Sequence, residues 1–159
     1  MRSFSASCLL LFLGVSILAA AAAVASEIEW SVNGVAVCTS TGRQLCRHVL
    51  RDGRGGAFIG WMDERAGYDY PEYYVQKIDS SGAVQWTSNG VAVKSGNAPT
   101  LAWGHLRLAA DGEGGVIVVW TMNADTQSPC DVYAQRIDAD GNEVWTSGGE
   151  LVYESYGSP

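Results

Sequence analysis

The feature that most constrains this chain is an internal repeat with offsets of 56 and 59 residues. The eight residues that begin at Trp30 recur from Trp86 with six identities, and both copies contain Asn-Gly-Val-Ala-Val. Asp52-Gly-Arg-Gly-Gly recurs as Asp111-Gly-Glu-Gly-Gly, and a Tyr-x-Gln-Lys/Arg-Ile-Asp pattern follows each copy. A third copy begins at Trp145. Periods of this length are typical of repeat architectures, in which each unit buries its face against its neighbour.

Each unit contains four short segments that are apolar or alternating and are separated by glycine turns, which is the pattern of β-strands. An Asn-Gly pair, a tight-turn signal, precedes the first segment of each unit. The segments are 34–38, 45–51, 57–62 and 73–78 in the first unit and 90–94, 105–110, 116–121 and 132–137 in the second. No stretch after residue 25 keeps a helical period. We therefore expect an all-β fold with two four-stranded units and the first strand of a third.

Residues 1–25 have the features of an export signal. Arg2 is followed by an apolar run at 9–18 and by Ala23-Val24-Ala25, a small-x-small cleavage pattern. We expect a signal helix, cleavage after Ala25 and a secreted, periplasmic or extracellular location. The competing interpretation is an uncleaved anchor over residues 9–25, at the lower length limit for a membrane span. The expected organisation is signal peptide 1–25, first unit 26–86, second unit 87–145, and the start of a third unit with a tail at 146–159.

The charge of the chain bears on its partners. The net charge is −7 at pH 7, and loss of Arg2 with the signal makes the chain more acidic. Nucleic acids and anionic membrane surfaces are bound through clustered Lys and Arg, so neither is an expected partner after cleavage. The remaining expectations are a protein or carbohydrate at the cell surface, or self-association through open faces of the units.

The order of the motifs resembles the repeats of large secreted bacterial β-propeller-like proteins. The resemblance covers Trp30 to about Val152, and it implies four-stranded blades around an axis, with the repeated Trp and Gly residues in blade packing. The residues that it assigns to packing are Trp30, Trp61, Trp86, Trp120, Trp145, Gly56 and Gly115. Closed propellers usually have about four to eight blades. Two units therefore predict a fragment of a longer reading frame, an oligomer that completes a ring, or two units packed as a sandwich.

Signal cleavage removes Cys8 and leaves Cys38, Cys46 and Cys130. In an oxidising compartment a Cys38–Cys46 bridge is plausible, because the two residues flank one short connection. The alternative is two unlinked cysteines on neighbouring strands. Cys130 has no expected partner. Three cysteines with two distant histidines lack the spacing of a zinc site, so no metal is expected.

The polar motifs do not predict catalysis. Strands rather than helices follow the glycine loops at 52–56 and 111–115, so these loops are hairpin turns and not phosphate sites. Residues 138–143 resemble the start of a calcium loop, but they are also ordinary turn formers. Asp63-Glu64-Arg65 is interpreted as an exposed, self-neutralising charge run at a strand end. We expect no catalytic residue and no cofactor, with the question of an enzyme left open if the chain belongs to a longer protein.

One group of aromatic residues departs from the repeat. Tyr68, Tyr70 and Tyr73 lie in the connection around Pro71, and Trp103 has no counterpart in the first unit. Aromatic side chains in loops can stack on sugars or peptides, so these four residues form a candidate ligand-stacking loop. The competing interpretation is partial burial of the same residues against the next unit.

Three functional hypotheses follow. The first is a non-enzymatic exported repeat module with a binding or structural role, which we expect to be a fragment of a longer repeat protein. The second is the N-terminal piece of a propeller enzyme, similar to sialidases and other glycosidases or to quinoproteins. The third is a small self-assembling β domain.

Overall fold

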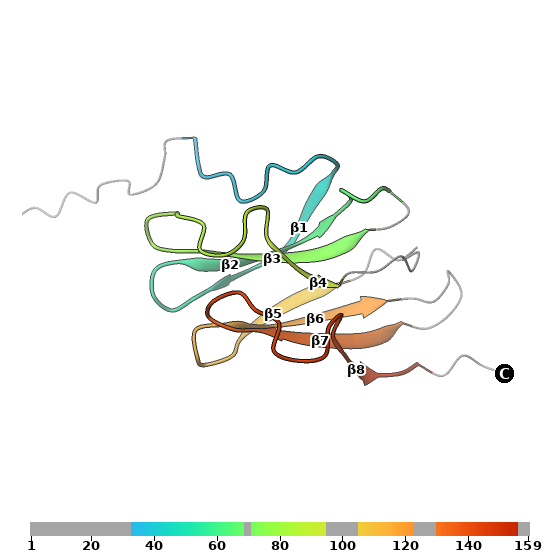
Figure 1. The fold of residues 1–159 in the computed structure, drawn as a ribbon. Helices are drawn as coiled ribbons and strands as arrows, with labels where there is room; N and C mark the ends of the chain where they lie inside the picture. Colours follow the sequence, from blue (N-terminus) through green and yellow to red (C-terminus); the bar gives the residue numbers. More distant parts are fainter. Residues whose placement is uncertain (1–32, 69–70, 95–104, 123–129, 156–159) are drawn as a thin grey trace, which may run out of the picture.

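The computed structural model describes residues 33–68, 71–94, 105–122 and 130–155. Within these ranges the chain forms eight strands and no helix, so no helix there can cross a membrane. The first sheet contains β1 (Gln44–Arg51), β2 (Ala57–Asp63), β3 (Glu72–Ile78) and β4 (Val91–Lys94), and the second contains β5 (Leu106–Ala110), β6 (Val116–Met122), β7 (Asp131–Ile137) and β8 (Glu150–Tyr153). In both sheets the strands lie in chain order and antiparallel (Figure 1). The expected all-β fold with two four-stranded sheets is confirmed.

Aspartate side chains close the hairpin turns of both sheets. In each turn the aspartate Oδ1 accepts hydrogen bonds from the N–H groups two and four residues later, at 2.8–2.9 Å. The four aspartates are Asp52, Asp79, Asp111 and Asp138. This is the Asx-turn geometry that favours aspartate in turns. The Asp-Gly-x-Gly-Gly motif is therefore a hairpin turn in both copies.

A buried glutamine fixes the connection to the last strand of each sheet. Gln76, fully buried in β3, accepts hydrogen bonds at Oε1 from the N–H groups of Lys77 and Trp86, at 2.9 and 3.1 Å. Its Nε2 donates to the carbonyl of Thr87 at 2.8 Å. Gln135 makes the same three bonds in the second sheet. Because a buried amide needs its partners, this side chain holds the tryptophan connection against the sheet.

A glycine lets the last strand of each sheet approach a tryptophan. Gly90 has a φ of +88°, and a Cβ added to it would lie 2.4 Å from Cη2 of Trp61. Gly149 has the same relation to Trp120, also at 2.4 Å. Each indole also stacks on a tyrosine of the neighbouring strand, with ring centroids 5.9 and 6.0 Å apart. Only glycine fits where the conformation is left-handed and the ring is this close.

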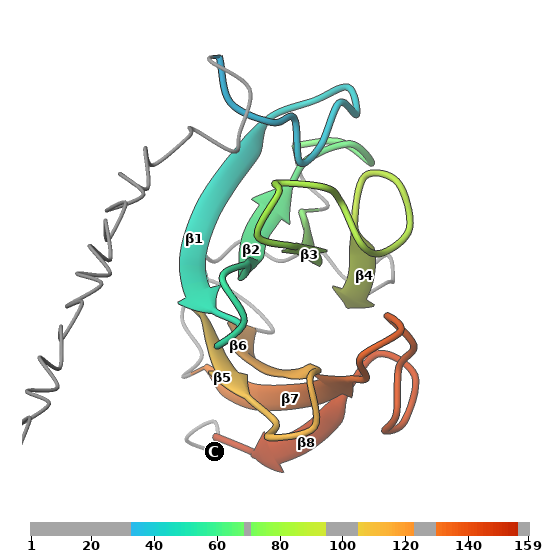
Figure 2. The same ribbon diagram turned by 90° about the vertical axis from the view of Figure 1, so that its left-hand side faces the viewer.

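The two sheets pack face to face, and β1 lies beside β5 along one side of the stack (Figures 1 and 2). One cluster of buried side chains joins them. Its members are Phe58, Met62, Tyr73, Val75, Trp86, Val93, Leu106, Leu108, Val116, Val118, Trp120 and Ile137. The core therefore sits between the sheets, and each sheet buries an apolar face by contact with the other.

Some strands take different places from those that the sequence predicts. Residues 34–38 form no strand, and β4 closes the first sheet by pairing with β3 instead of opening the second unit. In the same way β8 pairs with β7 and completes the second sheet, so the expectation of the first strand of a third unit is wrong. The turn that ends at Gly90 brings β4 back beside β3, whose free edge offers the nearest unpaired backbone groups. The expected signal helix at 1–25 lies outside the described residues.

Candidate interaction surface

The two faces of each sheet carry different side chains. We call the face with Trp61 in the first sheet and Trp120 in the second the tryptophan face, and the opposite face the reverse face. Because side chains alternate along a strand, Phe58 and Met62 lie on the reverse face of the first sheet. This reverse face packs on the tryptophan face of the second sheet, with the ring centroids of Tyr73 and Trp120 6.3 Å apart. The contact is heterologous, since the two sheets use different faces.

Trp86 is the main anchor of this contact. Its side chain is 7% exposed, and its Nε1 donates a hydrogen bond to the carbonyl of Ala139 in the second unit at 3.0 Å. On one side its ring lies 5.6 Å from that of Phe58. On the other side a Cβ added to Gly141 would come within 2.7 Å of its Cγ. Trp86 thus lies between the first sheet and the turn at 138–142.

Two polar contacts fix the relative position of the sheets. The N–H of Leu108 donates to Nδ1 of His48 at 2.9 Å, which joins β5 to β1. Lys77 Nζ donates to the carbonyl of Gly114 at 2.8 Å, which joins β3 to a turn of the second sheet. Hydrogen bonds of this kind depend on direction, so they define one arrangement of the two faces.

The reverse face of the second sheet has residues equivalent to those on the reverse face of the first sheet, but they are more exposed. Trp145, equivalent to Trp86, is 37% exposed instead of 7%. Val152, equivalent to Val93, is 63% exposed instead of 0%. Because the two sheets share their strands, turns and glutamine network, the difference arises from what covers each face. The first sheet is covered by the second.

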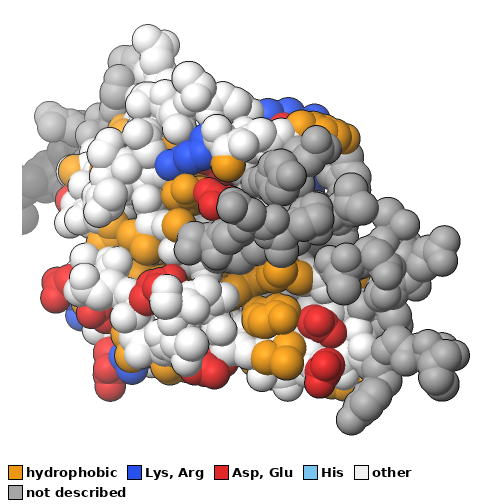
Figure 3. Space-filling view, turned by 45° about the vertical axis from the view of Figure 1, so that its right-hand side comes forward, with side chains coloured by type: hydrophobic (Ala, Val, Ile, Leu, Met, Phe, Trp, Pro, Cys, Tyr) orange, Lys and Arg blue, Asp and Glu red, His pale blue; other side chains and the backbone are white. Residues whose placement is uncertain are grey.

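Exposed apolar side chains gather at the C-terminal end of the second sheet. They are Val144, Trp145, Leu151, Val152 and Tyr153, each at least 37% exposed, and we call them the apolar patch. Figure 3 shows hydrophobic side chains grouped in the lower half of the molecule, at the level of the second sheet, beside Asp and Glu side chains. Leu151 pairs with Tyr133, which stacks on Trp120, so it lies on the tryptophan face, whereas Trp145 and Val152 mark exposed apolar surface on the reverse face. Exposed apolar surface on a small domain marks an interaction site.

The charge run at the end of β2 is built differently from the expectation. Asp63 is fully buried, and its Oδ2 accepts hydrogen bonds from Trp61 Nε1 at 2.8 Å and from Arg65 Nη2 at 2.6 Å. The guanidinium of Arg65 lies 3.7 Å from the ring centroid of Tyr74, and its Nη2 is 3.5 Å from Cys38 Sγ. The interpretation of an exposed run is therefore wrong for Asp63. The Trp-x-Asp spacing was the available signal, because residues i and i+2 of a strand share a face.

This cluster has no counterpart in the second sheet. Burial alone would raise the pKa of Asp63, but hydrogen bonds from Arg65 and Trp61 outweigh it and leave that pKa below its ordinary value. Met122 takes the equivalent place, and Trp120 Nε1 is buried without a hydrogen-bond partner in the part of the chain that the structure describes. The cluster therefore ties the segment around residue 38 to the tryptophan face of the first sheet.

Of the four residues of the candidate ligand-stacking loop, the structure describes Tyr68 and Tyr73, and these two do not share a surface. Tyr68 is 68% exposed, and the guanidinium carbon of Arg43 lies 5.7 Å from its ring centroid. Tyr73 lies in β3, 3% exposed, and burial raises its pKa to about 12. It belongs to the core because its place in the strand alternation points it at the second sheet. Tyr70 and Trp103, like the packing residue Trp30, lie outside the described residues.

The three cysteines of the described chain are free thiols, so the Cys38–Cys46 bridge, one of the two alternatives, is not formed. Cys46 is exposed on β1, paired across the ladder with Trp61. Cys38 Sγ instead contacts Arg65 and lies 3.9 Å from Asp63 Oδ2. Cys130 is exposed at the start of β7.

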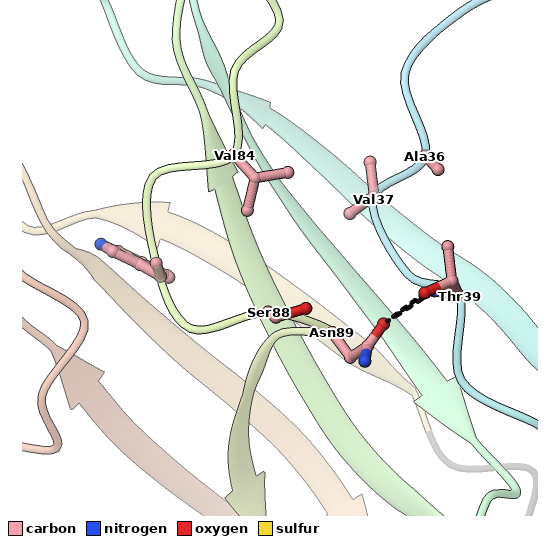
Figure 4. Close-up of a pocket in the computed structure, with 7 residues that line it drawn as sticks. Ala36, Val37, Thr39, Val84, Ser88 and Asn89 are labelled. Carbon is pink, nitrogen blue, oxygen red and sulfur yellow. Dashed lines mark hydrogen bonds between the residues drawn. The ribbon is translucent and has the colours of Figure 1, made fainter.

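A hollow of about 320 Å³ lies between residues 36–39 and residues 84–89 (Figure 4). At one end the N–H of Thr39 donates to Asn89 Oδ1 at 2.8 Å, and the Thr39 hydroxyl lies 3.2 Å from the same oxygen. Val37 and Val84 supply apolar walls. Ligand sites combine such walls with several convergent polar groups, and the polar side chains here are Ser88 and the Thr39–Asn89 pair, whose groups bond to each other. The hollow marks where segment 33–40 meets the connection that precedes β4.

The turn at 138–143, which resembles a calcium loop, is held by its own backbone. The N–H and side chain of Asn142 bond to the Asp138 carboxylate and lower its pKa. Donors pointed at both carboxylate oxygens oppose a cation there. Within the described ranges no three His, Cys, Asp or Glu side chains are grouped to hold a metal ion.

Comparisons with models of protein families, with curated proteins and with solved structures find no match. The features of the chain that bear on its function are the repeat, the contact between the sheets and the open reverse face.

Proposed function

We propose that this chain is an exported, non-enzymatic repeat module of the β-propeller type, and that the reverse face of its second sheet binds a further unit of the same kind. The observation that carries the proposal is the pair of equivalent tryptophans. Trp86 docks on the turn of the following unit, whereas Trp145 occupies the same repeat position with 37% of its side chain exposed.

The heterologous contact supports this proposal. A contact between unlike faces leaves one face of each kind free, and it continues until a ring closes or a filament forms. Here no second sheet covers the tryptophan face of the first sheet, which segment 33–40 contacts through Arg65, or the reverse face of the second sheet. Repeat units of this size depend on neighbours for burial, so the second sheet gains stability from another unit.

The repeated residues support a binding or structural role. Those that recur between the units close turns, stack rings or fix the tryptophan connection, and all of these are packing roles. The leader-like residues 1–25 support export to a compartment where such modules display surfaces. N-terminal sequencing of the exported product should give Ser26 as the first residue.

A chain with a third unit tests the proposal directly. Residues 95–153 are duplicated after Tyr153, so that the appended turn can meet Trp145. All chains that are compared carry Val35→Pro, so that they do not associate through residues 34–38 and no second copy covers Trp145. Labelling with 5-fluorotryptophan gives a ¹⁹F signal for this indole, assigned with the Trp145→Phe variant. We expect the signal to shift toward that of Trp86 and to lose its sensitivity to solvent, and we expect the melting temperature to rise.

The matched control is the same three-unit chain in which the appended copy of Gly141 is replaced by valine. Because Gly141 leaves room for the docked indole in the parent chain, the valine should block docking and keep Trp145 solvent-sensitive. A Trp145 signal that is identical in both three-unit chains and in the parent chain would refute the proposed surface.

A further inference from the structure

Segment 33–40 has the sequence of a fourth strand but no strand partner in the described chain. Asn33-Gly-Val-Ala-Val37 is identical to Asn89-Gly-Val-Ala-Val93, which contains most of β4. β4 pairs with β3, whereas residues 33–40 take part in no ladder. Equal sequences have equal strand propensity, so the difference lies in the absence of a β3-like edge within reach.

The place of this segment is that of a strand from a preceding unit. Cys38 reaches the cluster on the tryptophan face of the first sheet through Arg65, and Thr39 bonds to Asn89 at the entry to β4. The connection before β4 meets the second unit in the corresponding way, through Trp86 and Ala139. Each Asn-Gly-Val-Ala-Val segment thus lies against the unit that follows it.

The second sheet offers an edge that suits this segment. All four residues of β8 are exposed, and Glu150 stands opposite Ala134, where the first sheet pairs Val91 with Val75. Segment 33–40 would place the apolar Val35 at this position. A short exposed edge strand with a charge at a packing position is a weak closure for a sheet.

We propose that residues 34–38 of a second copy of this chain replace β8 and pair with β7, so that the copies join head to tail. This inference rests on the proposed function, because it names the occupant of the open reverse face. The register follows from β3 and β4: Val35 pairs with Ala134, Ala36 with Tyr133, and Cys38 with Val132. The tryptophan face of the incoming copy then covers the reverse face of the second sheet, repeating the contact between the two sheets of one copy.

The register makes a disulfide test possible. Facing residues of an antiparallel pair have Cα atoms about 4.5–5.5 Å apart, within the range that a disulfide bridges. The full chain is expressed with its leader as a Cys46→Ser, Cys130→Ser, Val132→Cys variant, and the product is purified reduced and then oxidised with glutathione disulfide. We expect a disulfide between Cys38 of one copy and residue 132 of another as the main cross-link, identified by peptide mass spectrometry.

Two further variants provide the controls. With Cys38→Ser and Tyr153→Cys added, residue 132 can bond to residue 153 of β8, its partner within one copy. A 132–153 bond within one copy as the main product would show that β8 stays in place and would overturn the proposal. Val35→Pro in the cross-linking variant removes the N–H that pairs with β7 and should abolish the intermolecular bond, whereas Val35→Thr should retain it.

Absence of the 38–132 bond in a folded chain would overturn the proposal, as would a bond of equal yield in the Val35→Pro variant. If the three-unit chain docks its appended unit but the 38–132 bond does not form, strand donation is wrong and the proposed function stands. If both fail, the reverse face is not a binding surface.

Discussion

Replacing the two equivalent tryptophans separately measures what the contact between units contributes. We compare Trp86→Ala with Trp145→Ala in a Val35→Pro background, which removes the proposed strand donation and keeps the chain monomeric. The two residues share the same connection and the same glutamine network, so most local effects of the substitution cancel.

The structure gives the size of the expected difference. Trp86 is 7% exposed and Trp145 is 37% exposed, a difference of 30% of the residue surface. For a tryptophan surface of about 250 Å², this difference corresponds to roughly 2 kcal/mol at about 25 cal/mol per Å². The hydrogen bond from Trp86 to Ala139 adds about 1 kcal/mol. Trp86→Ala should therefore lower the free energy of unfolding by about 3 kcal/mol more than Trp145→Ala does.

Urea unfolding followed by circular dichroism measures both free energies, and light scattering on the same samples confirms the monomer. The comparison requires equal m-values, since a changed m-value indicates a change in the unfolded or native state. Equal costs for the two substitutions, or a larger cost for Trp145→Ala, would refute the reasoning that Trp86 anchors the contact and Trp145 does not.

Three other substitutions test the framework of the sheets. Gly90→Ala should lower the free energy of unfolding by about 1–3 kcal/mol more than Gly112→Ala does, because both glycines have positive φ but only Gly90 faces an indole ring. Equal losses of stability in thermal unfolding would contradict this. Gln76→Leu should lower the free energy of unfolding by at least about 3 kcal/mol, since three backbone groups lose their hydrogen-bond partner. A decrease below about 1 kcal/mol would show that water replaces the amide. The stability that Asp63 contributes should be present above about pH 4 and should disappear as the pH falls through its lowered pKa. Asp63→Asn should therefore flatten the acid side of the profile of unfolding free energy against pH. An unchanged profile would argue against the pair of Asp63 with Arg65.

The sequence predicts the local structure well because that structure depends on local rules. Turn aspartates, alternating strands and repeated tryptophan and glycine positions all act over a few residues. Among the described residues the structure has them where the repeat places them, except that residues 34–38 form no strand. The burial of Tyr73 also followed a local rule, since alternation along β3 turns it toward the second sheet. The sequence places Tyr73 both in the alternating segment 73–78 and beside the connection around Pro71, and only the alternation accounts for its burial.

The assignment of Asn-Gly-Val-Ala-Val to a sheet could not be read from the repeat. A repeat is periodic, so the boundary between units can be drawn before or after this segment, and both choices match the repeated sequence equally well. The pairing is decided by which strand has a free edge when the segment arrives, and that is a property of the folded neighbour. The same reason explains why β8 completes the second sheet and why residues 34–38 have no ladder.

The candidate surface was only partly predictable. The repeat identified Trp86 and Trp145 as equivalent packing residues, but their different exposure appears only when the sheets are stacked. The buried Asp63 cluster depends on Arg65 folding back over Tyr74, a contact between strands that spacing alone does not specify.

The most direct test of the central claim, that the open reverse face binds another unit supplied by a second copy, is the solution mass of the purified chain by light scattering over a range of concentrations. The account predicts a folded β protein whose mass is a discrete multiple of the single chain, and a single-chain mass for the Val35→Pro variant. A folded protein that keeps the single-chain mass at every concentration would contradict it.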